Sequence, residues 1–270
     1  MRVFLLLATL LVAGAASAPA GTISMTIAQR ATLTDGTLSV TVTLSNNGDE
    51  AAQSVVPVLR FRDQEARGTL RPALEPKTSV EDTLTITTDV GAGRWPYRLA
   101  VDYTDANQYP FQALQVQVVA AGNPPPSKVA ITSVKPQGPV AGTSSVDVAM
   151  KNLAGDARTL VVGLMVPDGL EATQPGGTVA LAGWGEQKLA IPVTNRTALA
   201  GSRYPVFAVV EYDDGGVHEA SVGQGIVEII AAEGGVQQWR GSLLWVAGGL
   251  VALWLVFVGW SAMRRGSARS

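Results

Sequence analysis

The sequence predicts an all-β chain of two tandem β-sandwiches followed by one C-terminal transmembrane helix. Apolar and polar residues alternate along short segments, turn-forming residues separate these segments, and the whole pattern occurs twice. In the first such segment Leu38, Val40, Val42 and Leu44 alternate with Ser and Thr residues. A period of two residues places one face of a strand against a core and the other in water.

Further segments show the same alternation in the first half of the chain. One segment places an aromatic and aliphatic set on one face: Trp95, Tyr97, Leu99, Val101 and Tyr103. In another, Leu114, Val116 and Val118 alternate with Gln115, Gln117 and Val119. Turn residues separate the segments, as at Asp35-Gly36, Asn46-Asn47-Gly48 and Asp213 to Gly216. We expect antiparallel hairpins at these positions.

The repeat divides the middle of the chain into halves of about 100 residues, the size of a seven-stranded sandwich. Residues 38–51 resemble residues 145–158, and residues 93–105 resemble residues 202–214. Three consecutive prolines, Pro124 to Pro126, separate the halves and favour a stiff segment. Short strands of regular spacing with turn residues between them predict two immunoglobulin-like sandwiches, over 21–121 and 128–232, joined by a linker over 122–127.

Both ends of the chain are apolar. Residues 1–20 have one early arginine, an apolar stretch and small residues, a pattern typical of a cleaved signal peptide; an uncleaved anchor is the alternative. Residues 242–263 carry no charge and are long enough to cross a bilayer, and a basic tail over 264–270 follows. Residues 233–241 form a juxtamembrane linker. The positive-inside rule then places the tail in the cytoplasm and the sandwiches outside, in a periplasm or at a cell surface.

Composition excludes several functional classes. All 22 acidic residues lie between the apolar ends, so the predicted ectodomain is acidic and has no basic cluster for nucleic acid. The chain has no cysteine, which excludes disulfides, thiolate metal sites and a cysteine nucleophile. His218 is the single histidine and follows a turn, and no motif of a hydrolase or nucleotide-binding enzyme accompanies it. We predict no catalytic residues, no cofactor and a non-enzymatic protein.

Acidic residues recur near the same predicted hairpin of both halves: Asp102, Asp105, Glu211, Asp213 and Asp214. Calcium prefers carboxylate and carbonyl oxygens, so each hairpin is a candidate calcium site. Asp residues also form turns without any ion, and we favour that interpretation. We therefore predict no metal, with calcium at these acids as the alternative.

Three aromatic residues are candidate contacts for a partner or ligand. Trp184 lies between Gly183 and Gly185, a context that is often a loop tip that contacts a sugar or a protein. The same context suits an indole that caps the end of a sandwich, and we favour that packing role. Trp95 and Tyr97 form a second possible aromatic surface. These residues favour a carbohydrate-binding module as the alternative to protein binding.

Several of these motifs together resemble tandem Ig-like domains of bacterial and archaeal surface proteins, of the CARDB-like and S-layer-associated type. In the first half the motifs are Asn46 to Asp49, Trp95-Pro96-Tyr97 and residues 101–105; in the second they are Gly155-Asp156, Tyr204-Pro205 and residues 210–214. The resemblance covers most of residues 22–232. It implies membrane-anchored Ig-like domains that serve as spacers, adhesins or accessory subunits of transporters.

The sequence thus predicts a single-pass membrane protein that acts as an extracytoplasmic interaction or scaffold module. Its expected partner is a protein in or near the membrane, as in an accessory subunit of a transporter or envelope complex, or in a surface adhesin. Binding of carbohydrate is the alternative function.

Overall fold

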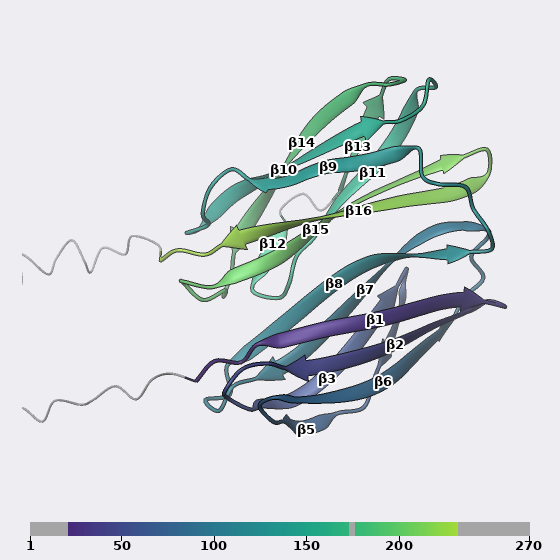
Figure 1. Ribbon diagram of the computed structural model, residues 1–270. Helices are drawn as coiled ribbons and strands as arrows, with labels where there is room; N and C mark the ends of the chain where they lie inside the picture. The colour runs from purple at the N-terminus through teal and green to yellow at the C-terminus, as the bar shows by residue number, and fades with distance from the viewer. Residues whose placement is uncertain (1–20, 173–175, 232–270) are drawn as a thin grey trace, which may run out of the picture. The chain divides into compact units, whose positions relative to one another are not determined.

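The computed structural model describes residues 21–172 and 176–231, and these residues form strands and connecting segments (Figure 1). This confirms the prediction of an all-β fold for the described residues. The predicted signal peptide, the juxtamembrane linker, the predicted transmembrane segment 242–263 and the basic tail lie outside the described residues. In the part of the chain that the structure describes, no helix combines the length and the apolar character needed to span a membrane.

Contacts group the described residues into two units. The first unit contains residues 21–89 and 98–115, and the second contains residues 90–97 and 116–231. Two strands, β7 and β8, therefore contribute residues to both units. In Figure 1 the chain colour runs from purple and blue in the first unit to green and yellow at the end of the second.

The first unit has the strand pairing of an immunoglobulin-like sandwich. Its strands are β1 (Met25–Thr34), β2 (Thr37–Asn46), β3 (Ala52–Phe61), β4 (Gln64–Arg67), β5 (Arg71–Leu74), β6 (Thr78–Thr87), β7 (Gly93–Thr104) and β8 (Pro110–Ala121). Strand β2 pairs antiparallel with β1 and β6, while β3 pairs with β4, β5 and β7. Strand β8 lies between β7 and β1 in the sheet order.

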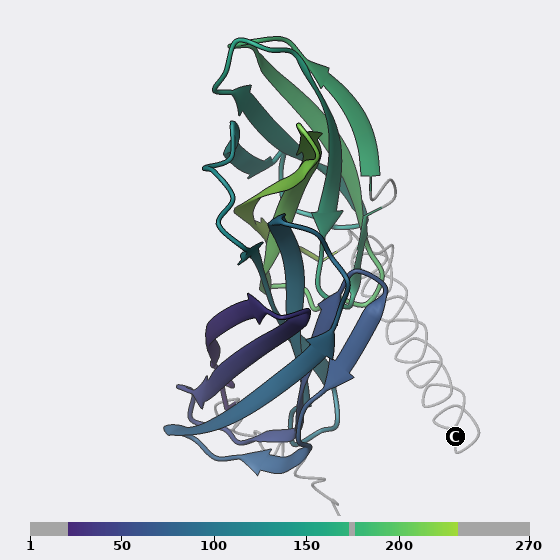
Figure 2. The same ribbon diagram turned by 90° about the vertical axis from the view of Figure 1, so that its right-hand side faces the viewer.

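The second unit repeats this arrangement with two four-stranded layers. Its strands are β9 (Val129–Pro136), β10 (Thr143–Asn152), β11 (Arg158–Met165), β12 (Leu170–Ala172), β13 (Gly176–Leu181), β14 (Glu186–Asn195), β15 (Arg203–Asp214) and β16 (Val217–Glu228). One layer has the order β12-β14-β10-β9 and the other the order β13-β11-β15-β16. Figure 2 shows the strands of this unit, coloured from teal to yellow-green, from a second direction. This is the strand order of an immunoglobulin-like sandwich, and apolar residues of both layers form its core.

Burial along β2 follows the predicted alternation. Every second residue from Leu38 to Asn46 is buried, and the residues between them are partly exposed. In β8 the alternation changes phase after Val116: Val118 is partly exposed, whereas Val119 is buried. The prediction placed Val118 on the buried face, and it is wrong there because the later residues of β8 pack in the second unit.

Two predicted turns have the backbone conformation that tight hairpins require. Asp35 and Gly36 join β1 to β2 with φ values of 51° and 69°. Gly215 and Gly216 join β15 to β16 with φ values of 61° and 83°. Positive φ at both central residues belongs to the type I′ turn, whose twist matches that of the adjoining strands.

A buried asparagine at the end of the second strand recurs in both units. Asn46 Nδ2 donates to the carbonyl oxygens of Glu50 (2.7 Å) and Leu74 (3.1 Å), and its Oδ1 accepts from the Gly48 amide (3.0 Å). Asn152 Nδ2 donates in the same way to Asp156 (2.7 Å) and Ala182 (3.0 Å). Each side chain satisfies backbone groups of two loops at once, which fixes both loops at that end of its unit.

Candidate functional site

Trp184 occupies the tip of the β13–β14 loop, and its side chain is largely exposed. The residue is 68% exposed and has a φ of 58°, a left-handed conformation that is uncommon for a bulky side chain. Its amide donates to the Ala154 carbonyl (2.8 Å), and a β-carbon on Gly183 would lie 1.8 Å from the Gly155 oxygen. Backbone contacts therefore hold the loop, and the indole contributes little packing to the fold.

The other two aromatic candidates lie inside the fold. Tyr97 is 1% exposed and its hydroxyl donates to Gln117 Oε1 (3.3 Å), while Trp95 is buried and donates from Nε1 to the Gly91 carbonyl (3.0 Å). Burial raises the pKa of Tyr97 to about 12 because the phenolate would lose its hydration. Neither ring forms an exposed aromatic surface, so Trp184 is the candidate contact that the structure presents to solvent.

The acids of the first half that were alternative calcium ligands bond to protein groups. Asp105 Oδ1 accepts from the amides of Asn107 (2.8 Å) and Tyr109 (2.9 Å), as in an Asx turn. Asp102 Oδ1 accepts from Gln112 Nε2 (2.6 Å). Across residues 21–172 and 176–231, no three His, Asp or Glu side chains come together in a way that suits a metal ion.

In the second half, two of the acids hold the single histidine. His218 Nε2 lies 3.1 Å from Glu211 Oε2, and its Nδ1 lies 3.2 Å from Asp213 Oδ1. The imidazole stacks on Trp95, with 3.8 Å between ring centroids and 14° between ring planes. These contacts fix the ring in one orientation at the β15–β16 hairpin.

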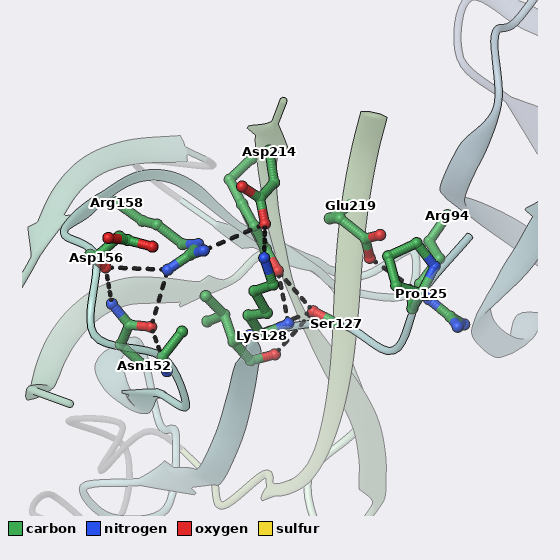
Figure 3. Close-up of polar contacts among 12 residues, drawn as sticks. Arg94, Pro125, Ser127, Lys128, Asn152, Asp156, Arg158, Asp214 and Glu219 are labelled. Carbon is green, nitrogen blue, oxygen red and sulfur yellow. Dashed lines mark hydrogen bonds and ion pairs between the residues drawn. The ribbon is translucent and has the colours of Figure 1, made fainter. Parts of the chain in front are cut away.

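The remaining acid, Asp214, belongs to a partly buried cluster of charged groups (Figure 3). Its Oδ2 lies 2.8 Å from Lys128 Nζ and 3.2 Å from Arg158 Nη2. The hydrogen bond from Lys128, and to a smaller extent the one from Arg158, holds the pKa of Asp214 below its ordinary range. The Arg158 side chain is 6% exposed and also donates to the Asp156 carbonyl (3.0 Å) and to Asn152 Oδ1 (3.3 Å). The cluster thereby connects the hairpin to the loop that Asn152 organises.

A second ion pair lies beside the linker. Arg94 Nε is 3.4 Å from Glu219 Oε2, and it donates to the Pro125 carbonyl at 3.0 Å (Figure 3). The Glu219 side chain is 3% exposed. Burial raises the pKa of Glu219, and the nearby Arg94 charge partly opposes this shift. A cavity of about 250 Å³ adjoins this pair and is lined by linker and hairpin residues.

Sequence reasoning did not single out Glu219, Arg94, Lys128, Arg158 or Asn152 as site residues. One signal was present for Asn152, because Asn46 occupies the same place in the repeat at the end of an alternating apolar strand. For Glu219 and Arg94 no local signal exists. Each is a charged residue in a strand of mixed pattern, yet the Glu219 side chain is 3% exposed and the Arg94 side chain 29% exposed.

The sequence matches no protein-family model, and a search of curated proteins found no match. Among solved structures, red sea bream transglutaminase is 11% identical over 77% of this chain and 31% of that one, with a TM-score of 0.28. A Salmonella α2-macroglobulin mutant is 15% identical over 78% of this chain and 16% of that one, with a TM-score of 0.33. The YadV chaperone is 15% identical over 74% of this chain and 99% of that one, with a TM-score of 0.31.

This chain spans less than a third of the transglutaminase and of the macroglobulin. Likenesses at these TM-scores carry no argument about function. The description as immunoglobulin-like rests on the strand order itself.

Proposed function

We propose that the chain is a non-enzymatic interaction module, anchored by its C-terminal segment, that holds a protein partner outside the cytoplasm through Trp184. The observation that carries this proposal is the exposed indole at a loop tip whose backbone is fixed without it. Exposed tryptophan at a rigid position supplies a large contact area with little loss of side-chain freedom. A strained backbone under such a residue is typical of functional positions.

The position of Trp184 within the second unit favours a partner over the bilayer as its contact. Trp184 bonds to Ala154, next to the end of β10 that pairs with Val129. Strand β16 leads from this end to Ile229, which bridges Val140 at the opposite end. Twelve residues of β16 at 3.3 Å each separate the two ends by roughly 35–40 Å. A membrane segment that follows residue 231 therefore leaves the unit at the end remote from Trp184.

Site-specific crosslinking in intact cells tests this role. A photoreactive residue placed at position 184 is expected to yield a discrete crosslinked product. In a second experiment the photoreactive residue is placed at an exposed position next to Trp184. Crosslinking from that position is expected when Trp184 is present and is expected to be lost in the Trp184→Ala variant. Tyr109→Ala is the matched control because Tyr109 is an exposed aromatic in a loop of the first unit. Equal crosslinking from the neighbouring position in the chain with Trp184 and in the Trp184→Ala variant would count against the proposal.

The anchored topology has a separate test, because it rests on the sequence pattern of residues 1–20 and 242–270. Reporter fusions after residue 231 and after residue 270 are expected to report opposite sides of a membrane. Extraction at high pH is expected to leave the chain in the membrane fraction. Release of the full chain into the soluble fraction would contradict the anchor while leaving the role of Trp184 open to its own test.

Carbohydrate binding by Trp184 is the second candidate, because an exposed indole also stacks on sugar rings. An array of glycans probed with the wild type and with Trp184→Ala distinguishes it from protein binding. Glycan binding that Trp184→Ala abolishes, in the absence of a crosslinked protein, would favour the carbohydrate function.

A further inference from the structure

Four connecting segments of the second unit meet at the end where β16 finishes: residues 137–142, 166–169, 196–202 and 229–231. We call them the exit surface, because the chain leaves the unit there. Backbone hydrogen bonds join them, from the amide of Arg196 to the Gly169 carbonyl (2.8 Å), of Gly201 to Ile229 (2.8 Å) and of Ile230 to Val140 (3.0 Å). The four segments are therefore fixed to one another.

Two large apolar side chains of the exit surface point into solvent. Leu199 and Ile230 are each 43% exposed. The loop that carries Leu199 is held by Asn195, whose Nδ2 donates to the Ala198 carbonyl (3.1 Å) and whose Oδ1 accepts from the Ala198 amide (2.8 Å). Pro139, in the segment that bonds to Ile230, is exposed as well. The exit surface thus presents apolar groups from three of its segments on a fixed backbone.

The exit surface also carries little charge. Its four segments contain two charged residues, Asp168 and Arg196, and Arg196 Nε pairs with Glu171 Oε2 at 2.5 Å. The opposite end of the unit carries three acids: Asp156, Asp213 and Asp214. Because cytoplasmic membranes contain anionic lipids, an end with few carboxylates approaches their surface at a lower electrostatic cost. Apolar character and charge both favour the exit surface over the opposite end for contact with lipid.

The length of chain after the exit surface places it close to a bilayer. Residues 232–241, ten in number, separate the last described residue from the predicted transmembrane segment 242–263. Ten residues span at most about 35 Å. A tether this short gives the exit surface an effective concentration on the order of millimolar at the headgroups, so a contact too weak to hold a free protein there is sufficient.

We propose that the exit surface rests on the bilayer, with Leu199 and Ile230 inserted among the lipid headgroups. The occupant of this apolar surface is a lipid surface, which accepts exposed Leu and Ile side chains at the boundary of its acyl chains. The inference rests on the proposed C-terminal anchor and adds a peripheral contact to it. This contact limits the tilt of the second unit and directs Trp184, at the opposite end, away from the membrane.

Fluorescence quenching on the full chain in lipid vesicles tests the contact. The chain has no cysteine, so Ala200→Cys carries the only label, at an exposed position next to Leu199. The vesicles contain equal parts of phosphatidylcholine and phosphatidylglycerol, with a nitroxide quencher on a fraction of the headgroups. We expect strong quenching of this label. Leu153→Cys is the matched control, because Leu153 is 45% exposed at the opposite end of the same unit, and its label is expected to be quenched several-fold less.

A second pair of variants separates contact from mere proximity. Leu199→Ser combined with Ile230→Ser leaves the tether intact, and is expected to reduce quenching of the Ala200→Cys label several-fold. Leu153→Ser combined with Val161→Ser is the control, because both residues are exposed apolar residues outside the exit surface. This control is expected to leave the quenching unchanged. All four substitutions are at exposed positions, so both double variants are expected to fold.

Three results would overturn the proposal. Release of the chain from the vesicles at high pH would remove the anchor itself, and the contact with it. In chains that stay in the vesicles at high pH, absent quenching, or equal quenching with and without Leu199 and Ile230, would contradict the lipid contact and leave the anchor in place. Energy transfer between labelled chains that persists in excess lipid, without quenching by the headgroup nitroxide, would show that a second copy of the chain covers the exit surface.

Discussion

The imidazole of His218 stacks on the indole of Trp95, and this contact joins the β15–β16 hairpin to the start of β7 within the second unit. The two ring nitrogens of His218 contact Glu211 and Asp213. Gly93, two residues before Trp95, pairs in parallel with His218 through the backbone. A β-carbon at Gly93 would lie 2.3 Å from the His218 carbonyl oxygen, so the two backbones approach too closely for any side chain there. The single histidine therefore has a packing role that its place after a turn did not indicate.

His218→Ala is expected to lower the free energy of unfolding by about 1 kcal/mol, the usual worth of a stacked aromatic pair. His218→Phe keeps a ring over Trp95 but loses the contacts with the two acids, and is expected to recover part of the loss. Urea denaturation followed by circular dichroism measures both. A His218→Phe variant no more stable than His218→Ala would show that the hydrogen bonds matter and the stack does not.

The two buried asparagines predict parallel losses in the two units. Asn152→Ala leaves the Asp156 and Ala182 carbonyls and the Ala154 amide without their partner. We expect a loss of about 2–4 kcal/mol, since buried backbone groups would become unsatisfied. Asn46→Ala is expected to cause a similar loss in the first unit.

Asn47→Ala is the control for this pair. Asn47 is exposed and bonds to Thr26 Oγ1 at the surface, so the expected change is under about 0.5 kcal/mol. Hydrogen exchange resolves which unit is destabilised in each variant. A loss spread evenly over both units after Asn152→Ala would contradict the local role assigned to this residue.

The all-β class, the strand-rich halves and the hairpin turns were predictable because they depend on local pattern. Leu38 to Leu44 alternate in the sequence and are buried in alternation, and Gly215-Gly216 permits one kind of tight turn. These features need no knowledge of distant residues.

The polar site was not predictable because it depends on contacts between distant segments. Trp95 was a candidate surface aromatic, but it is buried, and His218 stacks on it from a distant strand. Glutamate is usually a surface residue, yet Glu219 is 2% exposed. The exposure of Trp184 was one of two alternatives, and the neighbouring glycines could not decide between them.

Trp184 allows a test of backbone strain separate from its contacts. Because its φ is 58°, every L-residue at this position carries a cost that glycine avoids. Trp184→Gly is therefore expected to be more stable than Trp184→Ala by about 0.5–1 kcal/mol, and both are expected to fold. Thermal denaturation compares the two. If Trp184→Ala were the more stable variant, the left-handed conformation would not persist in solution.

Asp214→Asn probes the charged cluster. The change leaves the Arg158 guanidinium buried without its carboxylate partner and removes the contact with Lys128. We expect a loss of about 2 kcal/mol at neutral pH, less than for a fully buried pair because Asp214 is partly exposed.

The same variant has a signature in its pH dependence. The pKa of Asp214 is lowered in the folded state. The ionised Asp214 carboxylate therefore adds to the free energy of unfolding above the unfolded-state pKa, and this addition is lost as pH falls through the folded-state pKa. The wild type and Asp214→Asn are expected to converge in stability as pH falls below the ordinary aspartate pKa of 3.8. Asp213→Asn serves as control, since Asp213 is exposed and lies beside His218 and not in the Lys128–Arg158 cluster. A constant difference between the wild type and Asp214→Asn at all pH values would contradict the ion-pair explanation.

Glu219 predicts a pH dependence of the opposite sign. Burial raises the pKa of Glu219 above the ordinary value of 4.5. The folded state therefore binds the carboxyl proton of Glu219 more tightly than the unfolded state does. Stability is then greatest below the unfolded pKa and falls as pH rises through the folded pKa. Glu219→Gln removes this ionisation, and is expected to melt a few degrees above the wild type at pH 8 and at the same temperature as the wild type near pH 4. Glu228→Gln is the control because the carboxyl of Glu228 is exposed, and this variant is expected to melt like the wild type at both pH values. If Glu219→Gln were less stable than the wild type at pH 8, the contact between Glu219 and Arg94 would outweigh the cost of burying the charge.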